Sequence, residues 1–241
     1  MGKVVFITGA SKGIGLETAK LLAEKGYKVY GGARSDFNAK GVTSVKLDVT
    51  DTDSVTNAVK YITDKEGGID ILINNAGMGI SDAIENTPEE QSKYIFEVNF
   101  FGPFRLIKHC LPYLRKSGGK IINISSVAAA LCIPFQAFYS CSKAALDALA
   151  FALIPEVKPF GITVTNVLPG DTKTSFTAAR QKSYSDNDAV YGERIKKSIQ
   201  VMEKDEQNGM PAIKVSDVIL RCINKKSPPV YVAVGFKYKL F

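Results

Sequence analysis

The sequence predicts an α/β fold in which a parallel sheet is wound with helices on both faces. In the first part of the chain, four short apolar runs alternate with segments of helical periodicity, the pattern typical of such a sheet. A glycine-rich turn joins the first run to the first helical segment. The 241 residues, 45% of them hydrophobic, suffice for one full core. We therefore expect a single domain over residues 1–241.

The glycine-rich turn follows the first predicted strand. Val4–Ile7 is continuous and rich in β-branched residues, as expected of a strand covered on both faces. The turn Thr8–Gly15 comes next, and helical periodicity then continues to Ala23. Glycines let the backbone approach a phosphate, and the helix start presents free N–H groups. The placement predicts a nucleotide-binding turn.

The second predicted strand, Tyr27–Ala33, ends at a cation, Arg34, with Asp36 two residues later. In dinucleotide folds an acid near this point binds the ribose hydroxyls, whereas a cation accommodates a 2′-phosphate. Lys12 in the glycine turn supplies a second cation. We interpret Arg34 and Lys12 as a preference for NADP(H) over NAD(H). The alternative is two solvated surface cations.

Polar residues follow the third and fourth predicted strands. Ser44–Leu47 runs into Asp48 and Val49, and Asp48 either holds the adenine amino group or caps the next loop. A helix begins near Thr50–Asp53. The fourth strand, Ile69–Ile73, leads into Asn74-Asn75-Ala76-Gly77.

A long helical stretch is predicted after Pro88, with Asn99 inside it and Pro103 in its middle. An asparagine side chain competes for backbone hydrogen bonds, so Asn99 weakens the helix. It has either a functional role or a structural one, bracing neighbouring loops.

The fifth predicted strand, Lys120–Ile124, precedes Ser126 at the carboxyl edge of the sheet, where open α/β folds place ligands. After the apolar loop Val127–Phe138, Tyr139 and Lys143 lie one helical turn apart on one face. An adjacent ammonium stabilises a phenolate, so the pair could exchange protons near neutral pH. The alternative is a solvated helix face.

The chain changes character after the sixth predicted strand, Gly161–Val167. Residues 175–211 are largely polar, with a predicted flexible joint at 183–188 and an amphipathic helix at Tyr191–Gln207. We expect this insertion to be a helical lid over the substrate. A helix at Val215–Ile223 and a strand at Val230–Val234 complete the fold.

Composition narrows the functional classes. The net charge of +7 comes from scattered lysines among acids, without a basic block interleaved with aromatics, so we expect no nucleic-acid partner. Four cysteines in no compact pattern indicate a reduced, cytoplasmic protein. We expect neither a membrane span nor a metal site; the single histidine, His109, has no partner at ligand spacing.

Taken together, these motifs resemble the short-chain dehydrogenase/reductase family, which has a Rossmann-type doubly wound fold. The similarity covers roughly the whole chain through the turn Thr8–Gly15, Asn74–Gly77, Asn99, Ser126, Tyr139 with Lys143, and Pro169-Gly170. The long segment through Tyr191 and the ending Pro229–Val232 look most like the branch of 17β-hydroxysteroid and retinol dehydrogenases. Members of this branch often carry a further apolar tail, whereas this sequence stops at Phe241.

The resemblance implies roles for the four catalytic residues. Ser126 would bind the substrate oxygen, and Tyr139 would protonate it as hydride arrives. Lys143 would lower the tyrosine pKa and hold the nicotinamide ribose, and Asn99 would anchor a water that resupplies protons. The implied cofactor-binding residues, together with those argued above, are Gly9, Ser11, Lys12, Gly13, Ile14, Gly15, Arg34, Asp48, Val49, Asn75, Ala76, Gly77, Tyr139, Lys143, Pro169, Gly170, Thr172 and Thr174.

We therefore expect an NADP(H)-dependent oxidoreductase that interconverts a hydroxyl and a carbonyl. Apolar residues in the loop and the lid (Leu131, Phe135, Phe138, Ile199 and Met202) favour a bulky steroid- or lipid-like substrate. Alternatives are an NADP(H)-sensing binding protein without turnover and a reductase of small aldehydes or quinones. Small residues on the helix after Tyr139 suit either subunit packing, in a homodimer or homotetramer, or internal packing.

Overall fold

A parallel sheet forms the centre of the molecule in the computed structural model, which describes residues 2–182, 188–235 and 238. Its seven strands within the described ranges are β1 (Val4–Thr8), β2 (Lys28–Ala33), β3 (Val42–Lys46), β4 (Ile71–Asn74), β6 (Lys120–Ile124), β7 (Thr163–Pro169) and β11 (Tyr231–Val234). They lie in the order β3-β2-β1-β4-β6-β7-β11, and every neighbouring pair is parallel. The predicted doubly wound fold is confirmed.

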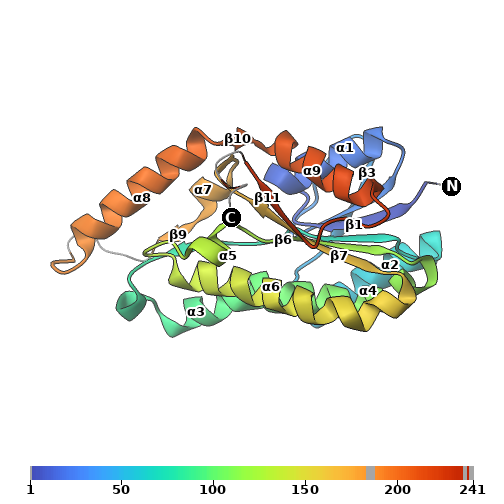
Figure 1. Cartoon of the computed structure of the whole chain (residues 1–241), viewed down its shortest axis with the longest axis horizontal. Coiled ribbons are helices and arrows are strands. Elements are labelled where there is room, and N and C mark those ends of the chain that lie inside the picture. Colours follow the sequence, from blue (N-terminus) through green and yellow to red (C-terminus); the bar gives the residue numbers. More distant parts are fainter. Residues whose placement is uncertain (1, 183–187, 236–237, 239–241) are drawn as a thin grey trace.

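Helices cover both faces of this sheet (Figure 1). One face carries α1 (Gly13–Glu24) and α9 (Ala212–Asn224), and the other carries α2 (Thr52–Glu66), α4 (Gly102–Ser117) and α6 (Ala137–Val157). Strand β1 shows why both layers form: Val4 and Phe6 join the core under α2, α4 and α6, whereas Val5 and Ile7 join the core under α1 and α9. Side chains alternate across a strand, so a continuous apolar run fills two cores.

The remaining elements of the described residues lie outside the central sheet and the five helices that cover it. They are β5 (Ile80–Ser81), paired with β9 (Gln181–Lys182); β8 (Thr172–Lys173), paired with β10 (Met210–Pro211); η1 (Ile84–Asn86); α3 (Glu89–Phe96); the π-helical turn η2 (Glu97–Phe101); α5 (Ala128–Leu131); η3 (Lys158–Phe160); α7 (Phe176–Ala179); and α8 (Gly192–Gln207).

Most predicted elements differ from the observed ones by a few residues, and two of the differences have an identifiable physical cause. The single helix expected after Pro88 is α3, the π-turn η2 and then α4, with Asn99 in the π-turn and Pro103 in the first turn of α4, where its missing N–H costs nothing. The strand expected at Gly161–Val167 begins later, at Thr163, because Gly161 has a φ of 71° and ends the η3 turn.

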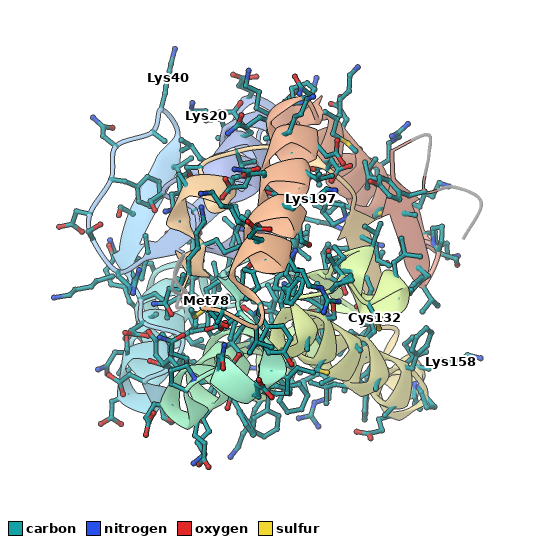
Figure 2. All side chains as sticks on the ribbon, turned by 90° about the vertical axis from the view of Figure 1, so that its left-hand side faces the viewer. Lys20, Lys40, Met78, Cys132, Lys158 and Lys197 are labelled. Carbon is teal, nitrogen blue, oxygen red and sulfur yellow. The ribbon has the colours of Figure 1, made fainter. Side chains whose placement is uncertain are left out.

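The predicted lid segment contains α7, β9, α8 and β10. Helix α8 extends away from the body in Figure 1 and faces the viewer in Figure 2, with Lys197 on its outer side. Its buried residues Ile195 and Ile199 pack with Ala83, against Phe135 and Tyr191. Of the predicted flexible joint, residues 183–187 lie outside the described residues.

One stretch, Ala137–Phe160, is apolar and long enough to cross a membrane by length and composition alone. It comprises α6 and η3, and α6 contacts β7, α3 and α5. Core helices of globular proteins have the same composition, and we interpret α6 as one of them.

Candidate active site

A cavity of about 390 Å³ opens at the carboxyl ends of the strands. Parallel strands bring their ends to one edge, so the turns after β1, β2, β4, β6 and β7 all reach it. Predicted site residues in its lining are Gly9, Ser11, Lys12, Gly13, Ile14, Arg34, Asp48, Val49, Asn75, Ala76, Gly77, Ser126, Tyr139, Lys143, Pro169, Gly170, Thr172 and Thr174. Gly15 and Asn99 are not in the lining.

The glycine turn is tied to the turn after β4. The Thr8 hydroxyl accepts from the backbone N–H groups of Asn75 and Ala76, at 3.0 and 2.9 Å. The Asn75 amide donates back to the carbonyls of Thr8 and Gly9, at 2.9 and 3.1 Å. Gly15 sits behind this junction, where a Cβ atom would lie 2.2 Å from the Gly9 oxygen. Gly15 therefore permits close packing rather than lining the cavity.

Two cations, Lys12 and Arg34, lie where the turns after β1 and β2 line the cavity. This part of the cavity is here called the nucleotide end. Lys12 directly precedes α1, and Arg34 directly follows β2. Both side chains are exposed, and neither forms an ion pair within the described ranges. They are free to bind an anionic group.

Asp48 has a structural role as well as a place in the cavity lining. One carboxylate oxygen accepts from the Thr50 backbone N–H at 2.9 Å and from the Thr50 hydroxyl at 2.7 Å. The alternative that Asp48 caps the loop is thus observed. A contact with adenine stays a prediction.

Ser126, Tyr139 and Lys143 line the part of the cavity formed by the end of β6 and by α6, here called the catalytic end. The Ser126 hydroxyl accepts from the Ala128 N–H at 3.1 Å. Lys143, one turn further along α6, lies with Nζ 5.9 Å from the centre of the Tyr139 ring and donates to the Ile124 carbonyl at 2.8 Å. The end of β6 therefore holds the ammonium beside the phenol.

Burial affects the protonation of both Tyr139 and Lys143. It raises the pKa of Tyr139, and the Ser126 side chain only partly offsets this. Burial also lowers the pKa of Lys143 to about 8, although Asp147 acts in the opposite sense. That Lys143 acidifies Tyr139 stays a prediction, and loss of water around both groups acts against it.

Asn99 braces the loop beside the cavity. Its side-chain oxygen accepts from the Met78 N–H at 2.9 Å, and its amide donates to the Met78 carbonyl at 2.9 Å and to the Ser142 hydroxyl at 3.0 Å. Ser142 in turn donates to the Tyr139 carbonyl at 2.8 Å. The π-turn places Asn99 where it joins the Gly77–Gly79 loop to the helix that carries Tyr139. Its bracing role is observed, and the water-anchoring role stays a prediction.

A ladder of buried asparagines was missed by the sequence reasoning. Asn74, Asn123 and Asn166 are register partners on β4, β6 and β7, and their side chains are joined by hydrogen bonds of 2.9 Å. Asn166 then donates to Asp147 on α6 at 2.9 Å, and Tyr231 donates to the other Asp147 oxygen. The available signal was an asparagine near the end of three successive strands.

The substrate side of the cavity also differs from the expectation. Met202 lines it as predicted, whereas Leu131, Phe135, Phe138 and Ile199 are not in the lining. Phe135 and Ile199 instead pack under α8. The lining includes residues that the sequence reasoning missed: Met78, Gly79, Ile133, Gln136, Phe176, Ala179, Gln181 and Glu206.

A glycine-rich turn, a buried serine and lysine, and a half-buried tyrosine around one cavity are typical of dinucleotide-dependent oxidoreductases. No group of three or more His, Cys, Asp or Glu side chains suited to a metal ion occurs in the ranges that the structure describes. Residues 3–185 match the family of short chain dehydrogenases. The chain belongs to the short-chain dehydrogenase/reductase family.

Similar proteins cover nearly the whole chain. A 3-ketodihydrosphingosine reductase from Bacteroides thetaiotaomicron is 42% identical over 97% of this chain and 88% of its own length. The crystal structure of a short-chain dehydrogenase from Streptomyces avermitilis is 30% identical, covers 98% of this chain and 89% of its own, and superimposes with a TM-score of 0.87. A short chain dehydrogenase from Burkholderia cenocepacia in complex with NADP is 25% identical over 99% and 90% of the two chains, with a TM-score of 0.79.

Proposed function

We propose that this protein is an NADP(H)-dependent oxidoreductase that interconverts a hydroxyl and a carbonyl on a bulky, lipid-like substrate. The observation that carries the proposal is that Ser126, Tyr139 and, one turn further along α6, Lys143 all line the cavity that the glycine turn also lines. These groups can bind an oxygen atom and deliver a proton to it.

The residues at the nucleotide end fit a phosphorylated dinucleotide. Gly9 has a φ of 66°, and a Cβ atom there would lie 2.9 Å from the Ala76 backbone, so the turn needs glycine. The α1 N-terminus offers N–H groups to a pyrophosphate. The free cations Lys12 and Arg34 suit a 2′-phosphate. The NADP in the related Burkholderia cenocepacia structure supports the same choice.

In the proposed reaction, the chain's own residues handle the substrate oxygen and its proton. NADPH, when bound, supplies the hydride that reduces the carbonyl carbon. Ser126 holds the carbonyl oxygen, and Tyr139 gives that oxygen a proton, which completes the alcohol. Lys143 keeps positive charge near the phenolate that remains. Oxidation of an alcohol uses the same groups in reverse.

The substrate class follows from the far end of the cavity and from the relatives. Ile133, Phe176 and Met202 make part of the wall apolar, whereas Gln136 and Glu206 add polar groups. An amphiphilic ketone fits such a lining better than a uniformly apolar ketone does. Since a relative of 42% identity carries the name 3-ketodihydrosphingosine reductase, we propose a long-chain lipid ketone of that kind. The segment with α7 and α8 would serve as its lid.

The test is NADPH oxidation, followed by absorbance, with 3-ketodihydrosphingosine, steroid ketones, retinal and small carbonyls, repeated with NADH. We expect turnover of the long-chain ketone with NADPH preferred. Turnover of small carbonyls alone would replace the proposal with a general aldehyde or quinone reductase. Tight NADPH binding without any turnover would favour a cofactor-sensing binding protein.

Substitution of Tyr139 tests the chemistry separately. Tyr139→Phe should reduce turnover at least a hundredfold because the proton donor is lost, while the dissociation constant for NADPH stays nearly unchanged. Tyr61→Phe on the outer face of α2 is the matched control and should retain full activity. Normal turnover by Tyr139→Phe would sink the catalytic assignment.

A further inference from the structure

Arg180 is a buried cation beside the catalytic end of the cavity, although nothing in the sequence pattern singled it out. It lies between α7 and β9, and its side chain is only 1% exposed. Its guanidinium pairs with Glu206 on α8 at 2.5 Å. The other Glu206 oxygen accepts from the Thr177 hydroxyl at 2.6 Å. Both carboxylate oxygens therefore hold the lid segment together, and they fix the position of the arginine.

The guanidinium is incompletely satisfied. Its Nε and Nη1 atoms are buried and have no hydrogen-bond partner among the described residues. Buried donors in native proteins are nearly always paired, and an unpaired charged one is expensive. A fold that keeps such a cation buried without full pairing invites a functional explanation, namely a negative charge that forms nearby during the reaction.

Tyr139 is where such a charge can form. The Arg180 guanidinium lies 5.7 Å from the centre of the Phe176 ring, and the Phe176 ring lies 5.8 Å from the Tyr139 ring. Phe176 and Glu206 line the same cavity as Tyr139. Phe176 is thus a neighbour of both the cation and the phenol, so the charge of Arg180 lies close enough to Tyr139 to interact with it.

We propose that Arg180 is a positioning residue that stabilises the phenolate of Tyr139 from the lid side, with Glu206 setting the strength of this effect. The proposal rests on the proposed function, in which Tyr139 exchanges the proton. It gives the lid segment an electrostatic part in the reaction, in addition to covering the substrate.

The charged and polar groups around Tyr139 act in different directions. Burial raises the pKa of Tyr139, the Ser126 side chain and the Arg180 charge lower it, and the Glu206 charge raises it. Lys143 approaches from α6, but its ammonium is engaged by the Ile124 carbonyl. Arg180 and Glu206 therefore oppose each other at the phenol, although they attract each other.

These opposite effects can be tested with two substitutions that break the same ion pair. One removes the cation and the other removes the anion, so the two variants should shift the apparent pKa in opposite directions. Arg180→Met removes the cation and should move the apparent pKa of alcohol oxidation upward by about one pH unit. Glu206→Gln keeps the side chain's shape, removes the anion and should move it downward. Arg180→Lys keeps the charge and should stay near the wild-type value. Lys182→Met is the matched control. It breaks another ion pair to α8, the helix that carries Glu206, because Lys182 on β9 pairs with Glu203 on α8 at 2.5 Å.

A second readout needs no turnover. Tyrosine labelled with ¹³C at the ring carbon that bears the hydroxyl reports ionisation by NMR, and the Tyr139 signal is identified by its absence in Tyr139→Phe. The signal should titrate at higher pH in Arg180→Met and at lower pH in Glu206→Gln than in the wild type. If Arg180→Met does not fold, the comparison of Glu206→Gln with Arg180→Lys still decides the question.

Opposite displacements of the two variants would support the proposal. Equal displacements, or none, would overturn it and would mean that the ion pair only holds the lid in place. Failure of the proposed function can be told apart from failure of the Arg180 proposal. In the first case the wild type would lack Tyr139-dependent turnover, while the NMR titrations would still report on the effect of Arg180.

Discussion

Replacement of Lys143 with methionine tests how far the fold removes this ammonium from water. Lys143 is 5% exposed, and its Nζ donates to the Ile124 carbonyl at 2.8 Å. Burial lowers its pKa from the ordinary value of 10.5 to about 8, even though Asp147 favours the charged form. The folded protein therefore releases this proton at a lower pH than the unfolded chain does.

The sign and size of the effect on stability follow from this difference. Below about pH 8 both states hold the proton, and the cost of burying the charge is fully present. Between about 8 and 10.5 the unfolded state binds more protons, so the free energy of unfolding contributed by Lys143 rises with pH. The pKa difference corresponds to a total gain of roughly 3 kcal/mol across this window.

The assay is urea unfolding of the wild type and Lys143→Met at several pH values from neutral to alkaline. We subtract the free energy of unfolding of Lys143→Met from that of the wild type at each pH. This difference should rise through the window, because the titration of the other groups is common to both proteins and cancels. Lys158→Met removes an exposed lysine and controls for the change in net charge. A difference curve that stays flat for Lys143→Met would refute the inference that the ammonium is desolvated.

Three further predictions concern the glycine turn, the asparagine ladder and the cofactor phosphate. Gly15→Ala should weaken NADPH binding at least tenfold, since the new methyl would meet the Gly9 carbonyl at 2.2 Å; Gly68→Ala, with open space around it, should leave the dissociation constant unchanged. Asn123→Leu should lower the free energy of unfolding by about 3 kcal/mol, because groups on Asn74 and Asn166 lose their partner; a cost below ~1 kcal/mol in urea unfolding would contradict this. Arg34→Ala should raise the KM for NADPH about tenfold and leave that for NADH unchanged, as expected for one lost charge-assisted contact; equal changes in steady-state kinetics would argue against a 2′-phosphate site.

Local sequence patterns were enough to predict the fold and about half of the residues that line the cavity. Apolar runs such as Val4–Ile7 are rich in β-branched residues, and the turn Thr8–Gly15 stands between a strand and a helix. Both signals lie within a few neighbouring residues and depend on backbone preferences that act locally. Tyr139 and Lys143 are likewise neighbours on one helix, so their proximity could be read directly.

Only the tertiary structure decided how these groups behave. Arg180 comes near Tyr139 through its contacts with Phe176 and Glu206, and Asn123 is hydrogen-bonded to residues on two other strands. Neither arrangement produces a periodic pattern in the sequence, because Arg180 is far from Tyr139 in the chain and Asn123 is far from its two partners. Gly15 and Asn99 hold the loops of the cavity in place without lining it themselves. The spacing of residues in the sequence does not distinguish such a supporting role from a place in the lining. Burial raises the pKa of Tyr139, and burial is a property of the packed molecule that the spacing of residues along one helix does not reveal.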